Sequence, residues 1–170
     1  GDQSSITMRG DILAIGTSAE NIKFTSIYDT PVPGNWKYLR IESPSENSTL
    51  SYVRFEYGGR YFSTTALDAR AMVSIYEATT TILNSVFENS QIAGLRATRF
   101  NGTISGSSFN TGTTTNTDRV GLYIYEGAPT ISGSTFSTNY SGLTLESTNA
   151  TLNNLTFSNN YLGINSINST

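Results

Sequence analysis

Residues 121–157 read GLYIYEGAPTISGSTFSTNYSGLTLESTNATLNNLTF, and this stretch contains the same block twice. The first copy runs from Gly121 to Phe136 and the second from Gly142 to Phe157. In both copies apolar and polar residues alternate after the glycine and again before the phenylalanine. Alternation with a period of two is typical of a β-strand that buries one face. Gly, Asn and Ser separate the alternating runs, which indicates several short strands per block.

The same block occurs three more times toward the N-terminus. Its phenylalanines are Phe55, Phe87, Phe109, Phe136 and Phe157. The apolar residues five positions earlier are Leu50, Ile82, Ile104, Ile131 and Leu152, and a threonine precedes each: Thr49, Thr81, Thr103, Thr130 and Thr151. Aligned without gaps, the blocks have Ile41, Val73, Leu95, Leu122 and Leu143 as their second residue, and two positions later stand Ser43, Ile75, Ala97, Ile124 and Leu145.

A repeat of about 21 residues with turns at fixed positions is typical of a solenoid. Its short strands pair in parallel with the next coil, and parallel crossovers are nearly always right-handed. We therefore predict an all-β protein, a right-handed parallel β-helix of about six to seven coils, with residues 1–170 as a single domain.

The two ends depart from the repeat. Residues 1–40 predict an atypical N-terminal coil and loop, in which Ala19 takes the place of the Ile expected five positions before Phe24. Residues 41–170 predict the regular coils. The last coil is incomplete, because the sequence ends at Thr170 before its Thr–Ile–Phe half. We expect either a longer solenoid or a terminal edge that something else covers.

Three insertions interrupt the repeat. Successive phenylalanines lie close together in the tight coils, and they are further apart between Phe24 and Phe55, between Phe55 and Phe87, and between Phe109 and Phe136. Because the block has no gap, the extra residues fall between a phenylalanine and the next block, at 26–38, 57–70 and 112–119. We expect all three at one corner of the coil, where insertions in a solenoid usually build a binding surface.

Aromatic and charged side chains are concentrated in these insertions. The candidate ligand-binding residues are Tyr28, Asp29, Trp36, Tyr38, Arg60, Tyr61, Phe62, Asp68, Arg70, Asp118 and Arg119. Aromatic rings stack on the apolar faces of sugars, and charged groups hydrogen-bond to hydroxyls. Alternatively, Trp36, Tyr61 and Phe62 pack the insertions against the outer strands.

A second column lies ten positions before each phenylalanine and consists of Ser45, Glu77, Arg99, Glu126 and Ser147. Two carboxylates beside an arginine could act in β-elimination or hydrolysis. The interpretation we favour is an exposed ladder of ion pairs.

The segments TILNSVFENS (81–90), TISGSSFNTG (103–112), TISGSTFSTN (130–139) and TLNNLTFSNN (151–160) resemble the right-handed β-helix repeats of secreted, pectate-lyase-like proteins. The resemblance covers roughly residues 10–170. It implies a secreted or cell-surface location, and a fold that hosts lyases, hydrolases, adhesins and structural proteins alike.

The composition limits the chemistry. The chain has no cysteine and no histidine, which removes thiolate metal ligands and the commonest general base. Calcium could bind loop carboxylates such as Asp29, but the spacing of the acidic residues does not support it. We predict no cofactor, no metal and no catalytic residue. A net charge of −3 does not provide the basic surface that binds nucleic acid. No apolar run is long enough to span a membrane.

The sequence favours a non-catalytic extracellular module, adhesive or carbohydrate-binding, whose partner is a polysaccharide or cell-surface glycan. Two alternatives stay open. One is a polysaccharide lyase or hydrolase that uses the same face. The other is a structural subunit of an extracellular filament or layer, assembled by self-association through the open C-terminal coil.

Overall fold

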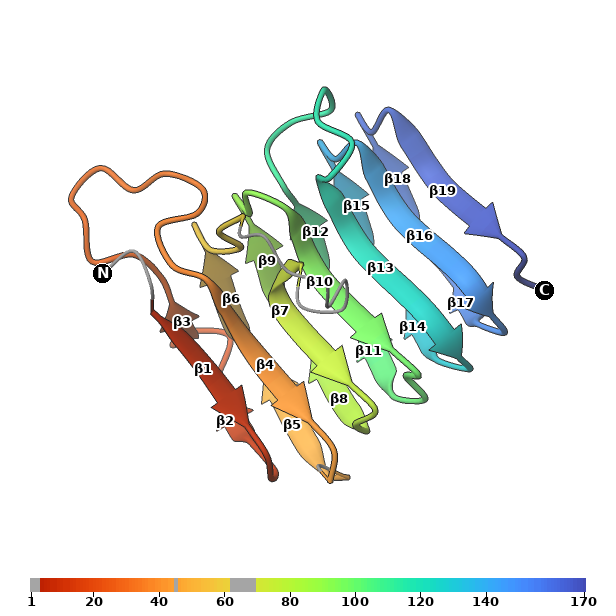
Figure 1. The fold of residues 1–170 in the computed structure, drawn as a ribbon, viewed down its shortest axis with the longest axis horizontal. Helices are drawn as coiled ribbons and strands as arrows, with labels where there is room; N and C mark the ends of the chain where they lie inside the picture. Colours follow the sequence, from red (N-terminus) through yellow and green to blue (C-terminus); the bar gives the residue numbers. More distant parts are fainter. Residues whose placement is uncertain (1–3, 45, 62–69) are drawn as a thin grey trace.

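The computed structural model describes residues 4–44, 46–61 and 70–170. Within these ranges all regular secondary structure consists of β-strands. These ranges contain no helix long and apolar enough to cross a membrane. The strands build three parallel sheets, which we call A, B and C (Figure 1).

Each sheet takes one strand from every coil. Sheet A contains β1 (Ser5–Met8), β4 (Tyr38–Glu42), β7 (Ala71–Tyr76), β10 (Ala93–Thr98), β13 (Val120–Gly127), β16 (Ser141–Thr148) and β19 (Leu162–Ile167). Sheet B contains β2 (Leu13–Ile15), β5 (Ser48–Ser51), β8 (Thr80–Leu83), β11 (Thr103–Ser105), β14 (Thr130–Ser132) and β17 (Thr151–Asn153). Sheet C contains β3 (Ile22–Phe24), β6 (Val53–Glu56), β9 (Val86–Glu88), β12 (Ser108–Asn110), β15 (Thr135–Ser137) and β18 (Thr156–Ser158).

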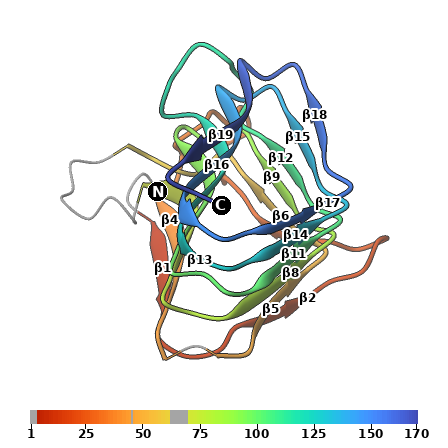
Figure 2. The same ribbon diagram turned by 90° about the vertical axis from the view of Figure 1, so that its right-hand side faces the viewer.

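The sheets enclose one interior, and Figure 2 shows them around it. In Figure 1 the chain advances from left to right while the strands of sheet A, nearest the viewer, run downward. The winding is therefore right-handed. The predicted β-helix is confirmed, with six coils of three strands followed by β19.

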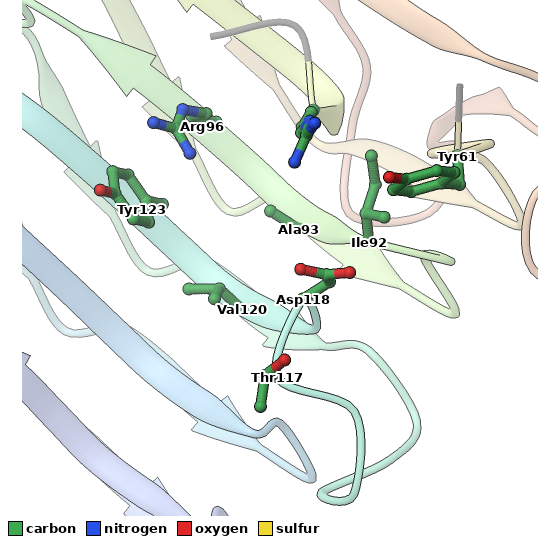
Figure 3. A pocket seen from close by; sticks show the side chains of 9 residues that line it. Tyr61, Ile92, Ala93, Arg96, Thr117, Asp118, Val120 and Tyr123 are labelled. Atoms are coloured by element: carbon green, nitrogen blue, oxygen red, sulfur yellow. The ribbon is translucent and has the colours of Figure 1, made fainter. Parts of the chain in front are cut away.

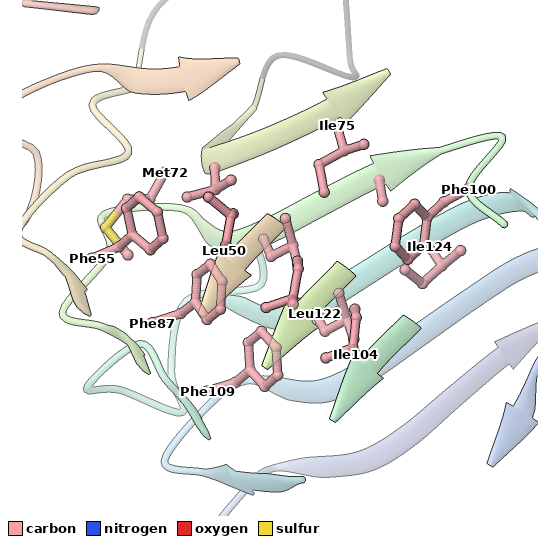
Figure 4. Close-up of a cluster of buried hydrophobic side chains, with 14 of the residues drawn as sticks. Leu50, Phe55, Met72, Ile75, Phe87, Phe100, Ile104, Phe109, Leu122 and Ile124 are labelled. Carbon is pink, nitrogen blue, oxygen red and sulfur yellow. The ribbon is translucent and has the colours of Figure 1, made fainter. Parts of the chain in front are cut away.

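The interior consists of stacked columns of identical or similar side chains (Figure 4). The phenylalanines of sheet C stack from Phe24 to Phe157 with ring centres 4.8–5.2 Å apart. The spacing follows the distance between neighbouring strands, about 4.8 Å. Phe55, Phe87 and Phe109 are fully buried, and burial of each contributes about 1.5–3 kcal/mol.

The corner between sheets B and C explains the recurring Gly and Asn before the phenylalanines. Asn84, Gly106, Gly133 and Asn154 occupy equivalent positions there, with φ between 48° and 59°. Glycine and asparagine tolerate this left-handed backbone better than other residues do. The chain can therefore turn sharply at this corner and enter sheet C.

The structure corrects the alignment of the first two coils. Leu39 pairs with Val73 and Ile41 with Ile75, so the gapless block does not extend to the coil that holds Phe55. Ser43 lies outside the interior column, and Ser45 lies outside the described residues. In the first coil Ala14, and not Ala19, pairs with Leu50. In the second coil the shift is two positions, which leaves the same face buried, so the apolar pattern alone could not separate the two registers. In the first coil the difference arises because residues 16–21 separate β2 from β3.

Candidate functional site

The three insertions leave the same corner of the coil, between sheets C and A, as predicted. They join β3 to β4 (25–37), β6 to β7 (57–70) and β12 to β13 (111–119). Tyr38 belongs to β4 and not to the first insertion.

The first insertion is packed onto the second. The indole Nε1 of Trp36 donates a hydrogen bond of 2.9 Å to the carbonyl of Glu56. The ring lies so close to Gly58 that a β-carbon there would come within 2.5 Å of it. Trp36 therefore holds the insertion down, as the packing alternative predicted for this residue.

The base of the second insertion is fastened to the coil that follows. Gln91 donates its backbone N–H to the carbonyl of Gly58 at 3.0 Å, and its side-chain Oε1 accepts the N–H of Tyr61 at 2.8 Å. Tyr61 as a residue is left 52% exposed. Phe62 and Asp68, two of the predicted site residues, lie outside the described residues.

The third insertion is closed at its base by Arg119. Its Nη1 donates to the carbonyl of Thr111 at 2.7 Å. Burial lowers the pKa of the Arg119 guanidinium. Asp118, one position earlier, is exposed to solvent. Arg119 therefore shapes the insertion, and Asp118 is the residue it presents.

The second and third insertions flank a hollow of about 150 Å³ on the outer face of sheet A (Figure 3). The hollow is lined by Tyr61, Arg70, Ile92, Ala93, Arg96, Thr117, Asp118, Val120 and Tyr123. In Figure 3 Tyr61 lies at one end and the pair Arg96 and Tyr123 at the other, with Ile92 and Ala93 between them.

Two arginine–tyrosine pairs line this hollow. The guanidinium carbon of Arg96 lies 3.9 Å from the ring centre of Tyr123, and that of Arg70 lies 5.7 Å from the ring centre of Tyr61. The Tyr123 hydroxyl donates a hydrogen bond to the Glu146 carboxylate. Burial, followed by this hydrogen bond, raises the pKa of Tyr123 to about 12, so its hydroxyl is a neutral donor at physiological pH.

The structure brings together some of the predicted residues and separates others. Tyr61, Arg70 and Asp118 line the hollow, whereas Arg60 and Arg119 do not. Tyr28, Trp36 and Tyr38 surround two other depressions next to β1 and β3. Asp29 is exposed and lines none of these three. The insertions therefore share a corner without forming one continuous site.

Sequence reasoning missed Arg96 and Tyr123. Each stands between the two interior-facing residues of its block, and they pair across β10 and β13. The aligned blocks already placed them in one outward column. This outward column beside the insertions is the signal by which the sequence marks them.

The predicted ion-pair ladder is confirmed. Arg99 donates hydrogen bonds to Glu77 and to Glu126, the latter at 3.0 Å. All three lie at the corner between sheets A and B, at the opposite end of the sheet A strands from the insertions. Their side chains are about a third to a half exposed, so the ladder lies in solvent and apart from the hollow.

Over the described ranges, no group of three or more acidic side chains lies close enough together to hold a metal ion. The chain matches no family model, no curated protein and no solved structure.

Proposed function

We propose that this chain is a non-catalytic, extracellular carbohydrate-binding module. In this proposal one unit of a polysaccharide or cell-surface glycan occupies the hollow between the second and third insertions. The observation that carries the proposal is the combination of the exposed Tyr61 ring with Arg96 and Asp118 around an apolar floor.

The lining suits the two kinds of surface that a sugar presents. A pyranose ring has an apolar face that can pack on Tyr61, Ala93 and Val120, while its hydroxyls face the charged side chains. Arg96 supplies donors and Asp118 supplies acceptors. At about 150 Å³ the hollow is smaller than the enclosed pockets of about 300–1,000 Å³ that bury small ligands. It therefore favours shallow contact with one unit of a longer chain.

The polar groups favour binding over cleavage. Glycoside hydrolysis ordinarily uses two carboxyl groups on either side of the scissile bond. Among the described lining residues Asp118 supplies the one carboxylate. The Tyr123 hydroxyl is protonated near neutral pH, and the rise of its pKa from 10.0 to about 12 makes it a still poorer general base there. The extracellular location is supported by the resemblance of the repeats to secreted β-helix proteins.

The proposal is tested with the 170-residue chain on a panel of immobilised polysaccharides, by biolayer interferometry. We expect the parent to bind at least one polysaccharide, and Tyr61→Ala and Arg96→Met each to weaken that binding by about tenfold or more, as is typical of central contacts. Arg99→Met is the matched control, because Arg99 lies at the opposite end of the same strands and should leave binding unchanged.

Two results would contradict the proposal. One is binding that Arg96→Met and Arg99→Met weaken equally, which would place the ligand elsewhere. The other is the appearance of new reducing ends or unsaturated sugars when the parent is incubated with the same panel. That result would establish the hydrolase or lyase alternative instead.

A further inference from the structure

The sequence contains one Asn–Gly pair, Asn101–Gly102. It lies at the corner between sheets A and B, in the turn from β10 to β11 (Figure 1). Asn101 is exposed to solvent and Gly102 is buried. In such a pair the backbone nitrogen after the asparagine can reach Cγ, the carbonyl carbon of the asparagine side chain, because glycine has no β-carbon to hinder the approach. A nucleophile and an electrophile are therefore held next to each other.

The packing of the coils requires glycine at position 102. A β-carbon there would lie 2.1 Å from the carbonyl oxygen of Thr80 in the preceding coil and 2.5 Å from the ring of Phe100. Neither neighbour can easily move away, because the first is backbone and Phe100 is fully buried. The fold therefore keeps a glycine after Asn101, and with it the reactive pair.

The next coil contacts the side chain of Asn101 at its carbonyl oxygen. Ala128 is the counterpart of Asn101 one coil further on, because Thr98 pairs with Tyr125. The backbone N–H of Ala128 donates a hydrogen bond of 2.9 Å to the Oδ1 of Asn101. Addition of a nucleophile to Cγ places negative charge on Oδ1, and N–H donors about 2.7–3.1 Å from such an oxygen lower the barrier to the addition. The Ala128 N–H is thus placed like the donor of an oxyanion hole.

We propose that Asn101 is a site of spontaneous covalent modification, which the fold promotes. The backbone nitrogen of Gly102 forms a bond to Cγ of Asn101 and loses its proton, while the bond from Cγ to Nδ2 breaks and the amide leaves as ammonia. The product is a cyclic succinimide. Water then opens this ring at either of its carbonyl carbons, which leaves aspartate or isoaspartate at the position. The net reaction consumes water, releases ammonia and needs no oxidant or reductant.

Both products change the corner between sheets A and B. Aspartate adds a negative charge two positions after Arg99, which already pairs with Glu77 and Glu126. Isoaspartate also lengthens the main chain by one atom just before Gly102, whose carbonyl accepts the N–H of Thr130 at 3.1 Å. The isoaspartyl chain should therefore unfold at a lower temperature than the parent. The hollow lies at the opposite end of the sheet A strands, so the modification is independent of the proposed glycan binding.

The test compares Asn101 with an asparagine at the equivalent position two coils further on. Asn149 is also exposed, but it is followed by Ala150. Ala150→Gly gives Asn149 the same following residue without the same donor. The N–H at the donor's position there belongs to Thr170, and it donates to a main-chain carbonyl of β16 at 3.3 Å. The variant therefore separates the effect of the dipeptide from the effect of the fold.

The folded Ala150→Gly chain is incubated near physiological pH and temperature, and peptide mapping by mass spectrometry follows the conversion of each asparagine to acid. Labelling with isoaspartyl methyltransferase identifies isoaspartate. We expect Asn101 to react about tenfold or more faster than Asn149, a modest factor beside the about 10²–10³ that an oxyanion donor contributes in enzymes. In urea the two rates should become similar, because unfolding removes the donor. Circular dichroism checks that the variant keeps the β-helix before urea is added.

Three results would overturn the proposal. Equal rates at Asn101 and Asn149 in the folded variant would show that the Ala128 N–H does not promote the reaction. A ratio of rates that stays the same in urea would assign the difference to the neighbouring sequence. A slower reaction of Asn101 in the folded chain than in urea would show that the fold protects this side chain.

Discussion

The guanidinium of Arg96 lies over the ring of Tyr123 on the neighbouring strand of sheet A, 3.9 Å from guanidinium carbon to ring centre. Tyr123 in turn donates a hydrogen bond from its hydroxyl to the carboxylate of Glu146 on the next strand. Three successive coils are thus joined on their outer face by one chain of polar contacts. Its first two members form an end of the candidate site, so the packing of sheet A also orients the site.

The alkaline stability of the protein should depend on Tyr123. Folding raises the pKa of Tyr123 from 10.0 to about 12, mainly through burial and then through Glu146, so the folded state favours the neutral phenol. This stabilisation is complete below pH 10 and is lost as the pH rises through 12. Between these values Tyr123→Phe should lose less stability than the parent in urea denaturation. The stability loss of Glu146→Gln should lie between those of the parent and Tyr123→Phe, because this variant removes the carboxylate but leaves Tyr123 buried. Parallel pH profiles for all three chains would refute this assignment.

The phenylalanine column should tolerate truncation at its end but not at its centre. Phe109→Ala leaves a cavity between two stacked rings and should lower the free energy of unfolding by about 3–5 kcal/mol. Phe157→Ala should cost clearly less, since Phe157 stacks on one neighbour and is only partly buried. Urea denaturation at low protein concentration measures both. Equal losses would indicate that the last coil is as well covered as the fourth.

The glycine column formed by Gly94, Gly121, Gly142 and Gly163 should need glycine only where another coil lies above it. A β-carbon at Gly121 would come 2.6 Å from the carbonyl oxygen of Gly142, so Gly121→Ala should cost about 1–3 kcal/mol in stability. At Gly163 the nearest atom would be 3.8 Å away, and Gly163→Ala should be tolerated. Thermal unfolding of the two variants compares identical substitutions at two positions of one column. Comparable losses would show that close approach is not the reason for the glycine.

The exposed ladder around Arg99 should contribute little to stability. Its partners Glu77 and Glu126 are held in solvent, where ion pairs lose most of their attraction to hydration and salt. Arg99→Met should therefore leave the thermal midpoint unchanged at both low and high salt. A drop as large as that of Phe109→Ala would show that the ladder stabilises the corner between sheets A and B.

The coil and its interior columns could be predicted because they depend on local, repeated information. Each interior side chain meets its counterpart one coil away, so alternation and spacing already name the neighbours of Leu95 or Phe109. The corner that holds the three insertions followed from the same alignment, although the first two coils carry further extra residues inside the block, at 16–21 and 43–47.

The side chains that meet in the site could not be predicted in the same way. The path of an insertion decides whether its residues face the sheet or solvent, and this path depends on contacts such as that of Gln91 with Tyr61. Trp36 is of a residue type that is common in binding sites, but its ring packs against Gly58. In the sequence pattern Arg96 and Tyr123 are ordinary outward-facing strand residues. Only the folded insertions place a hollow beside them.

The sequence by itself determined the β-helix, its interior columns and the corner that carries the insertions, because a period of two within a regularly repeated block admits one way to bury the apolar face. Tertiary structure alone decided the register of the first two coils. In the second coil a shift of two positions buries the same face and leaves the apolar pattern unchanged, and in the first coil residues 16–21 separate two strands that the repeat places next to each other. Tertiary structure also decided that Tyr61, Arg70 and Asp118 meet over sheet A while Tyr28 and Trp36 lie elsewhere, because contacts between insertions are not repeated along the chain.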